Sequence, residues 1–211
     1  MARKFKLTGL VLMMAAAFLL ALSAGAQEAV TEEDTEAGKS EILVAYFSRA
    51  GENWEVGYVD KGNTEIVAEM IADELGADLL KIETVMEYPE SYDEMLDVAT
   101  QQREDDERPE LKELSLNPED YQTIFLGYPI WWGGLPMPIY TFLEGYDFSG
   151  KVIYPFNTHG GSGVAGTDQE IADIALDADV KDGFAVTGKT AQNDPEKAKE
   201  QVTAYLNDIG Y

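Results

Sequence analysis

Hydroxyl, amide and guanidinium side chains gather in one stretch of the chain, between an apolar run and an amphipathic helical pattern. Ser48 and Arg49 follow the apolar run at 42–47, and Asn63 and Thr64 precede the helical pattern. Unpaired N–H groups at a helix start, together with the positive end of the helix dipole, form a binding site for an anion. We therefore predict that a phosphate binds here. The alternative is that Asn63 and Thr64 only cap the helix.

Two later segments carry residues that suit a flat ligand. The segment PIWWGGLP at 129–136 sets two tryptophans between prolines and glycines, and NTHGGSG at 157–163 contains the only histidine of the chain. Neighbouring residues of an extended chain point to opposite sides, so we expect at most one of Trp131 and Trp132 in the core. A tryptophan presented by such a loop can pack against an aromatic ligand. His159 is expected either to lie near that ligand or to be an ordinary loop histidine.

Alternating strand and helix patterns must position these three segments. We predict strands at 42–47, 77–83, 121–128, 151–156 and 181–187, with helices between them. Ser91 with Glu94, and Thr167 with Glu170, have capping-box spacing, and Asp194 followed by Pro195 is expected to open the last helix. This alternation predicts an α/β fold with a parallel sheet and helices on both faces. Ligands of such sheets bind beyond the carboxyl ends of the strands, so the three segments should surround one crevice.

The three segments together resemble the flavodoxin family, specifically a branch with a long first phosphate loop. The resemblance rests on YFSRAG with GNT, on GYPIWWG and on NTHGGSG, in this order, and it covers roughly residue 41 to the C-terminus. It implies a flavodoxin-like three-layer sandwich with a five-stranded parallel sheet of order 2-1-3-4-5. It also implies FMN as the cofactor and electron transfer as the activity.

The resemblance also implies a set of cofactor-binding residues and no catalytic or metal-binding ones. The phosphate group would be held by Ser48, Arg49, Ala50, Asn63 and Thr64; the flavin would lie along Pro129, Ile130, Trp131, Trp132 and Gly133; its other side would be closed by Thr158, His159, Gly160, Gly161 and Ser162. Residues 51–61 are inserted relative to a compact flavodoxin phosphate loop. The sequence leaves open whether Trp54 or Tyr58 of this insertion contacts the flavin.

Composition and the N-terminal segment restrict the partners and the location. Residues 1–26 join a basic start, an apolar run and small residues, the pattern of a signal peptide, and residues 27–40 form an acidic tether that we expect to be disordered. The sequence therefore predicts export, with a membrane anchor as the alternative if the leader is not cleaved. Beyond the leader, 12 cations face 40 acids, a net charge of −28, which argues against nucleic acid or anionic lipid as partners and favours basic partners. The chain has no cysteine, which excludes disulfides and iron–sulfur clusters.

Several functions are compatible with these patterns. The main hypothesis is an exported FMN-binding electron carrier that works between a reductase and an acceptor protein. The alternatives are an NAD(P)H-dependent flavin reductase of quinones or similar acceptors, and a flavodoxin-shaped module that has lost FMN. The run GSGVAG at 161–166 matches a dinucleotide motif, but it lies in the fourth strand–helix unit and four residues beyond its strand. A hydrolase with Ser162 as nucleophile is disfavoured because Val164 stands where the nucleophile elbow needs glycine.

Overall fold

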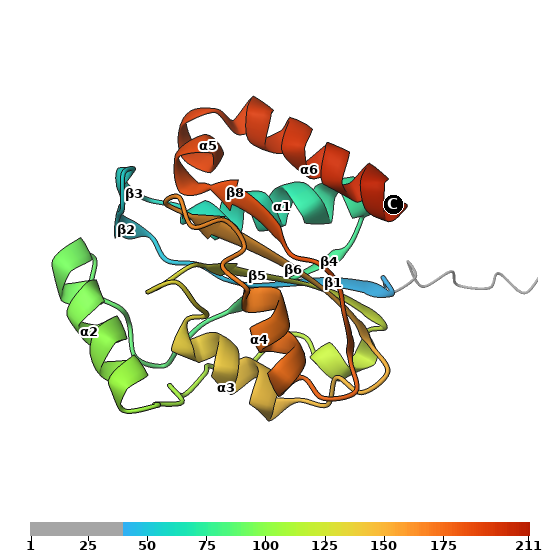
Figure 1. The fold of residues 1–211 in the computed structure, drawn as a ribbon, viewed down its shortest axis with the longest axis horizontal. Coiled ribbons are helices and arrows are strands. Elements are labelled where there is room, and N and C mark those ends of the chain that lie inside the picture. Colours follow the sequence, from blue (N-terminus) through green and yellow to red (C-terminus); the bar gives the residue numbers. More distant parts are fainter. Residues whose placement is uncertain (1–39) are drawn as a thin grey trace, which may run out of the picture. The chain divides into compact units, whose positions relative to one another are not determined.

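A computed structural model describes residues 40–211, and Figure 1 shows their arrangement. The expected signal peptide at 1–26, and the tether at 27–40 except its last residue, lie outside the described residues. The main sheet has the order β4-β1-β5-β6-β7, and β8 also pairs with β6. Its strands are β1 (Ile42–Phe47), β4 (Asp78–Ile82), β5 (Thr123–Pro129), β6 (Val152–His159), β7 (Asp179–Val180) and β8 (Phe184–Thr187). Every pairing in it is parallel, so the predicted order 2-1-3-4-5 is confirmed, with the fifth strand split into β7 and β8.

Helices cover both faces of this sheet, as Figure 1 shows. The helices are α1 (Asn63–Leu75), α2 (Tyr92–Glu104), α3 (Met137–Gly145), α4 (Thr167–Ile174), α5 (Gly188–Asn193) and α6 (Pro195–Ile209), with a short 3-10 helix at Pro118–Asp120. One face carries α1, α5 and α6, and the other carries α3 and α4. No helix within residues 40–211 has both the length and the apolar composition of a membrane span.

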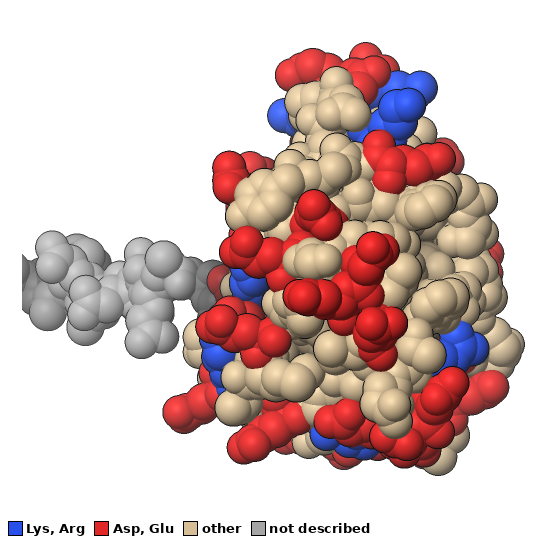
Figure 2. Space-filling view, turned by 90° about the vertical axis from the view of Figure 1, so that its left-hand side faces the viewer, with Lys and Arg blue, Asp and Glu red and all other residues tan. Residues whose placement is uncertain are grey.

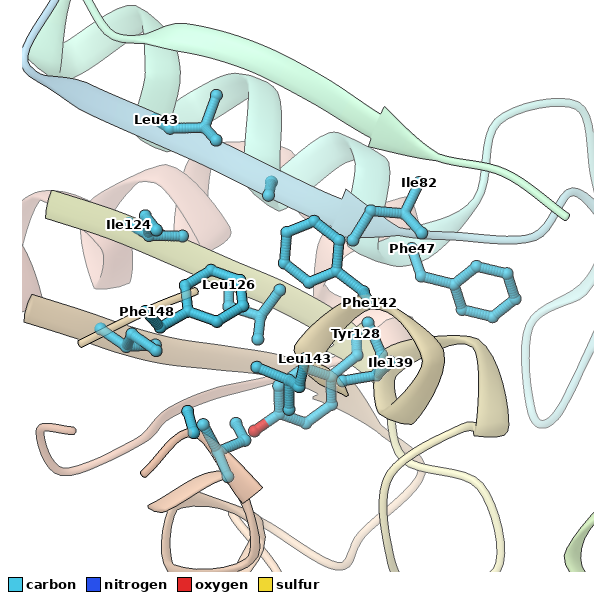
Figure 3. Close-up of a cluster of buried hydrophobic side chains, with 14 of the residues drawn as sticks. Leu43, Phe47, Ile82, Ile124, Leu126, Tyr128, Ile139, Phe142, Leu143 and Phe148 are labelled. Atoms are coloured by element: carbon cyan, nitrogen blue, oxygen red, sulfur yellow. The ribbon is translucent and has the colours of Figure 1, made fainter. Parts of the chain in front are cut away.

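The core consists of two apolar layers that share the central strands. Leu43, Ala45 and Phe47 of β1 pack on one side, with Tyr128 and Phe142 among their neighbours, and Figure 3 shows this cluster. Val44 and Tyr46 pack on the other side against α1 and α6. An unbroken apolar strand can therefore be buried on both faces, as the run at 42–47 predicts.

The insertion at 51–61 forms a second, two-stranded sheet that the sequence analysis did not predict. β2 (Gly51–Asn53) and β3 (Gly57–Val59) pair antiparallel as a hairpin. In Figure 1 this hairpin stands beside the start of α2, and α2 itself lies away from the central sheet. The predicted helix at 91–105 is thus present, but its neighbours include an inserted hairpin.

Both predicted capping boxes are wrong, because neither the Ser91 nor the Thr167 side chain caps its helix. The Ser91 side chain makes no capping hydrogen bond at α2, and the residue that caps α4 is Gly166. The Thr167 hydroxyl instead donates to the Val164 carbonyl and lies 2.8 Å from the Tyr128 hydroxyl. The Glu170 carboxylate accepts hydrogen bonds from the Leu135 N–H and the Tyr140 hydroxyl.

Two other expectations about element ends have opposite outcomes. The predicted cap of the last helix is confirmed, since the Asp194 side chain accepts a hydrogen bond from the Lys197 N–H. The predicted end of the fourth strand at residue 156 is wrong. Asn157 and Thr158 continue the pairing of β6 with β5 and β8, and His159 pairs with β8. Pairing on both sides keeps these residues extended although their side chains are polar.

Candidate functional site

A cavity of about 320 Å³ opens beyond the carboxyl ends of β5 and β6, and we call it cavity A. It is lined by Asn53, Trp54, Asn63, Tyr92, Met95, Leu96, Ala99, Pro129, Ile130, Trp131, Trp132, Thr158, His159, Gly160 and Gly188. These residues come from the hairpin, the start of α1, one side of α2 and the segments that follow β5, β6 and β8. Its volume lies at the lower end of the roughly 300–1,000 Å³ typical of small-molecule sites.

The structure brings together about half of the residues predicted to bind a cofactor. Those that line cavity A are Asn63, Pro129, Ile130, Trp131, Trp132, Thr158, His159 and Gly160. Ser48, Arg49 and Ala50 line a separate hollow instead, which also contains Lys81, Lys112 and Tyr88. Gly133, Gly161 and Ser162 are exposed and do not line the cavity. Thr64 is buried behind the cavity wall, with its hydroxyl 2.8 Å from that of Thr158.

The start of α1 supplies polar groups to cavity A. The cap position is Gly62, and no side chain of Asn63 or Thr64 caps the helix, so the capping alternative is wrong. A residue outside the helix binds one of its first N–H groups instead: the Ser48 hydroxyl oxygen accepts a hydrogen bond from the Glu65 N–H at 3.1 Å. The N–H groups of Asn63 and Thr64 have no acceptor within the helix. The Asn63 Oδ1 atom is buried and has no hydrogen-bond partner in the described part of the chain.

The two adjacent tryptophans have different surroundings. Trp131 packs edge-on against Phe47 and Tyr88, with ring centroids 5.4 and 5.1 Å apart, while 53% of Trp132 is exposed. This confirms the prediction that at most one of them lies in the core. Backbone hydrogen bonds join Trp131 and Gly134 in both directions, and Trp132 and Gly133 between them have φ of 51° and 73°. Positive φ at both central residues is typical of a tight type I′ turn, which projects the Trp132 ring outward.

The inserted hairpin contributes a third tryptophan to the cavity wall. The Trp54 ring lies 5.8 Å from the Tyr92 ring. A Cβ atom added to Gly160 would lie only 2.5 Å from Cδ1 of Trp54, so the indole lies directly over this glycine. Tyr58, at the other side of the hairpin, is equally exposed but does not line the cavity. Of these two side chains, Trp54 therefore lines cavity A and Tyr58 does not.

Hydrogen bonds from the backbone select one tautomer of the single histidine. His159 Nδ1 accepts hydrogen bonds from the N–H groups of Gly161 and Gly163, at 2.9 and 3.2 Å. A nitrogen that accepts such bonds carries no proton, so the proton of the neutral ring is on Nε2. Burial also lowers the pKa of His159 below its usual value. The ring is thus a neutral hydrogen-bond donor at the edge of cavity A.

The sequence analysis missed the contribution of α2. Its helical period correctly places Tyr92, Met95 and Ala99 on one side. The sequence predicts that Tyr92, Met95, Leu96 and Ala99 of this helix point inward to the core, whereas these residues also line cavity A. Periodicity identifies the apolar side of a helix but not what it packs against. Gly188 was missed too, and its missing Cβ matters because that atom would lie 2.4 Å from Nδ2 of Asn63.

Comparisons with known proteins agree with this architecture. The sequence model of a family described as Flavodoxin matches residues 41–203. A candidate flavoprotein from Bacteroides eggerthii is 28% identical, with a TM-score of 0.63, over 82% of this chain and 99% of that chain. One from Bacteroides uniformis is 24% identical, with a TM-score of 0.57, over 79% and 99%. A flavoprotein from Lactobacillus acidophilus, solved in complex with FMN, is 21% identical, with a TM-score of 0.54, over 74% and 97%. No curated protein matches the chain.

Proposed function

Because this chain belongs to the flavodoxin family, in which FMN binds at the switch point of the sheet, we propose that it binds FMN in cavity A and carries electrons between partner proteins. The observation that carries the proposal is the position of cavity A beyond β5 and β6, bounded by the segments after β1, β5 and β6. When bound, FMN supplies the redox chemistry, and the protein supplies binding and orientation.

The polar groups of cavity A match the polar parts of FMN. The unpaired N–H groups at the start of α1 suit the phosphate, which the positive end of the helix dipole also favours. The buried, unpartnered Oδ1 atom of Asn63 needs a donor, and the hydroxyl groups of the ribityl chain are such donors. His159 Nε2–H can donate to a carbonyl oxygen of the flavin.

The apolar walls of cavity A match the flavin ring. Trp54 and Tyr92 line it together with Trp131, Met95 and Leu96. Aromatic and aliphatic side chains favour a flat heteroaromatic ring and exclude water from it. One relative from Lactobacillus acidophilus was solved with FMN, which supports the same cofactor here.

The size and charge of cavity A favour a carrier over an NAD(P)H-dependent reductase. A volume of about 320 Å³ is at the lower end of the range for a site that holds one small molecule. Among residues 40–211, no Lys or Arg lines the cavity, so this part of the chain offers no cation to the phosphates of a second nucleotide. These features support the proposal that electrons leave through contact with a protein partner.

A basic partner protein and a location outside the cytoplasm complete the proposal. Figure 2 shows many Asp and Glu side chains, and few Lys or Arg, on the face it displays. The exposed acids of α2 include Asp93, Glu94 and Asp97, next to residues that line cavity A. Such a surface attracts a positively charged docking face.

The signal-peptide pattern at 1–26 supports export. N-terminal sequencing of the protein collected from outside the cells that produce it would test this proposal.

The absorption spectrum of the purified protein, before and after incubation with FMN and desalting, tests the proposal. We expect a flavin spectrum that stays with the protein after desalting, and little steady-state oxidation of NADH or NADPH. Loss of all FMN from correctly folded protein would refute FMN binding. Rapid, catalytic NAD(P)H oxidation would instead identify a reductase.

A further inference from the structure

Arg49 was expected to hold a phosphate, but its guanidinium is already engaged elsewhere. Its Nη1 donates to the Pro89 carbonyl at 2.7 Å and to the Glu90 carbonyl at 3.2 Å. Its Nη2 donates to the Glu52 carbonyl. Pro89 and Glu90 precede α2, and Glu52 is in β2, so one side chain joins two elements that are about 40 residues apart in the sequence.

Other contacts at the same place join the hairpin to the start of α2. The Glu52 N–H donates to the Glu90 carbonyl at 2.7 Å, and the Glu52 carboxylate accepts from the Tyr92 N–H at 3.0 Å. Gly51 has φ of 90°, and a Cβ atom there would lie 2.7 Å from both Arg49 Nη1 and the Glu90 carbonyl oxygen. A side chain at position 51 would therefore push the two elements apart.

This junction lies directly next to the outer wall of cavity A. Trp54 follows β2 by one residue, Tyr92 is the first residue of α2, and their rings are in contact. Both rings line the cavity. Whatever fixes the hairpin against α2 therefore also fixes these two rings relative to the cavity.

We propose that Arg49 is a positioning residue that joins the hairpin to α2 and so assembles the Trp54–Tyr92 wall of cavity A, rather than a phosphate ligand. The planar guanidinium suits this role because its N–H groups point in fixed directions and reach three carbonyls at once. A lysine has one ammonium group on a flexible chain and cannot reproduce this geometry. The part of the inference that concerns ligand affinity rests on the proposed binding of FMN.

A comparison of FMN with riboflavin distinguishes a positioning role of Arg49 from a phosphate-binding role. FMN and riboflavin share the flavin ring and the ribityl chain, and only FMN has the phosphate. We expect Arg49→Lys and Arg49→Ala to weaken both ligands by the same factor, about 10-fold or more since charged hydrogen bonds are lost. A phosphate ligand would behave differently: Arg49→Ala would weaken FMN alone, and Arg49→Lys would restore much of the affinity.

Hydrogen exchange of the flavin-free protein tests the junction without any ligand. We expect faster amide exchange in Arg49→Lys in the segments 50–60 and 88–93, and unchanged exchange in β1 and β5, which reports intact folding. Lys112→Ala is the matched control, because Lys112 lines the same hollow as Arg49 but pairs with Glu83 rather than with the hairpin. It should leave exchange and both affinities unchanged.

The outcomes distinguish this inference from the proposed function. Unchanged exchange at 50–60 and 88–93 in both Arg49 variants would overturn the positioning role, and so would a loss of affinity for FMN alone. If the wild-type protein binds neither flavin, the proposed function fails, while the exchange comparison still decides whether Arg49 joins the hairpin to α2.

Discussion

The hydroxyl oxygens of Thr64 and Thr158 lie 2.8 Å apart in the interior, 94 residues apart in the sequence. Thr64 is in the first turn of α1, Thr158 is near the end of β6, and only 1% and 2% of their surfaces are exposed. Each hydroxyl is thus a polar partner for the other. This contact fixes the start of α1 against the strand end that bounds cavity A.

Removing one of these hydroxyls should cost more than removing both. Thr64→Val or Thr158→Val leaves a buried hydroxyl unpaired, at a cost of about 1–3 kcal/mol, whereas the double variant replaces both groups by apolar ones of the same shape. The expected free energy of unfolding of the double variant is therefore higher than additivity gives. Denaturant unfolding of the four flavin-free proteins measures this coupling, and additive losses would contradict it.

Trp132 should lower the stability of the protein while it strengthens ligand binding. Its φ of 51° lies in the left-handed region, which a bulky residue adopts at a cost and which Asn tolerates. We expect Trp132→Asn to raise the free energy of unfolding by about 0.5–1 kcal/mol and to weaken FMN binding, because the exposed ring lines cavity A. Thermal unfolding and an FMN titration measure the two effects.

A substitution of the neighbouring glycine in the same turn should change the stability in the opposite direction. Gly133 has φ of 73° and open space around its missing Cβ, so Gly133→Ala adds only backbone strain. It should lower stability by about 1 kcal/mol. An increase in stability for Gly133→Ala, or a decrease for Trp132→Asn, would show that the turn is not strained as described.

Trp54 should contribute to flavin affinity, and Tyr58 should not. The two side chains belong to the same inserted loop and are 60% and 59% exposed, but only Trp54 lines cavity A. Loss of an aromatic wall weakens binding by about 1 kcal/mol, so we expect Trp54→Ala to raise the Kd for FMN by about fivefold. Tyr58→Ala is the matched control and should leave the Kd unchanged. Equal effects of the two substitutions would argue against a specific contact.

His159 should make the stability depend on pH in a defined direction. Burial lowers the pKa of the folded-state imidazole, so below the ordinary value of about 6.5 the unfolded chain binds a proton that the folded protein does not. The free energy of unfolding should therefore fall as the pH drops below about 6.5. Protonation would also break the bonds that Nδ1 accepts from Gly161 and Gly163.

Replacing His159 by a group that does not titrate tests this dependence. Gln can still accept a hydrogen bond through its side-chain oxygen, so His159→Gln should lose stability less steeply between pH 7 and pH 5.5 than the wild type. Urea unfolding of both flavin-free proteins at several pH values gives the two slopes. Identical slopes would mean that His159 does not titrate in this window.

Much of the fold follows from local patterns along the chain. The apolar run at 42–47 predicts a strand buried on both faces, and Asp194 with Pro195 predicts the start of α6; both are confirmed. The order of the parallel sheet was also predicted correctly, because the family resemblance supplied a topology that the strand and helix periods alone do not define. The strand burial and the helix start depend on residues close together in the sequence, whereas the strand order depends on a pattern that spans the whole domain.

The composition of the site was decided by contacts between distant residues. The sequence alone predicts that the segments near Asn63, Trp131 and His159 meet beyond the strand ends, because parallel strands place those segments at one edge of the sheet. Local patterns do not indicate that Trp54 and α2 form the remaining wall or that Arg49 binds three backbone carbonyls, and the folded domain shows both. The physical reason is that a side chain's partner depends on which backbone groups lie within about 3 Å of it. Residues 51–61 and 89–92 come that close only when the whole domain is folded.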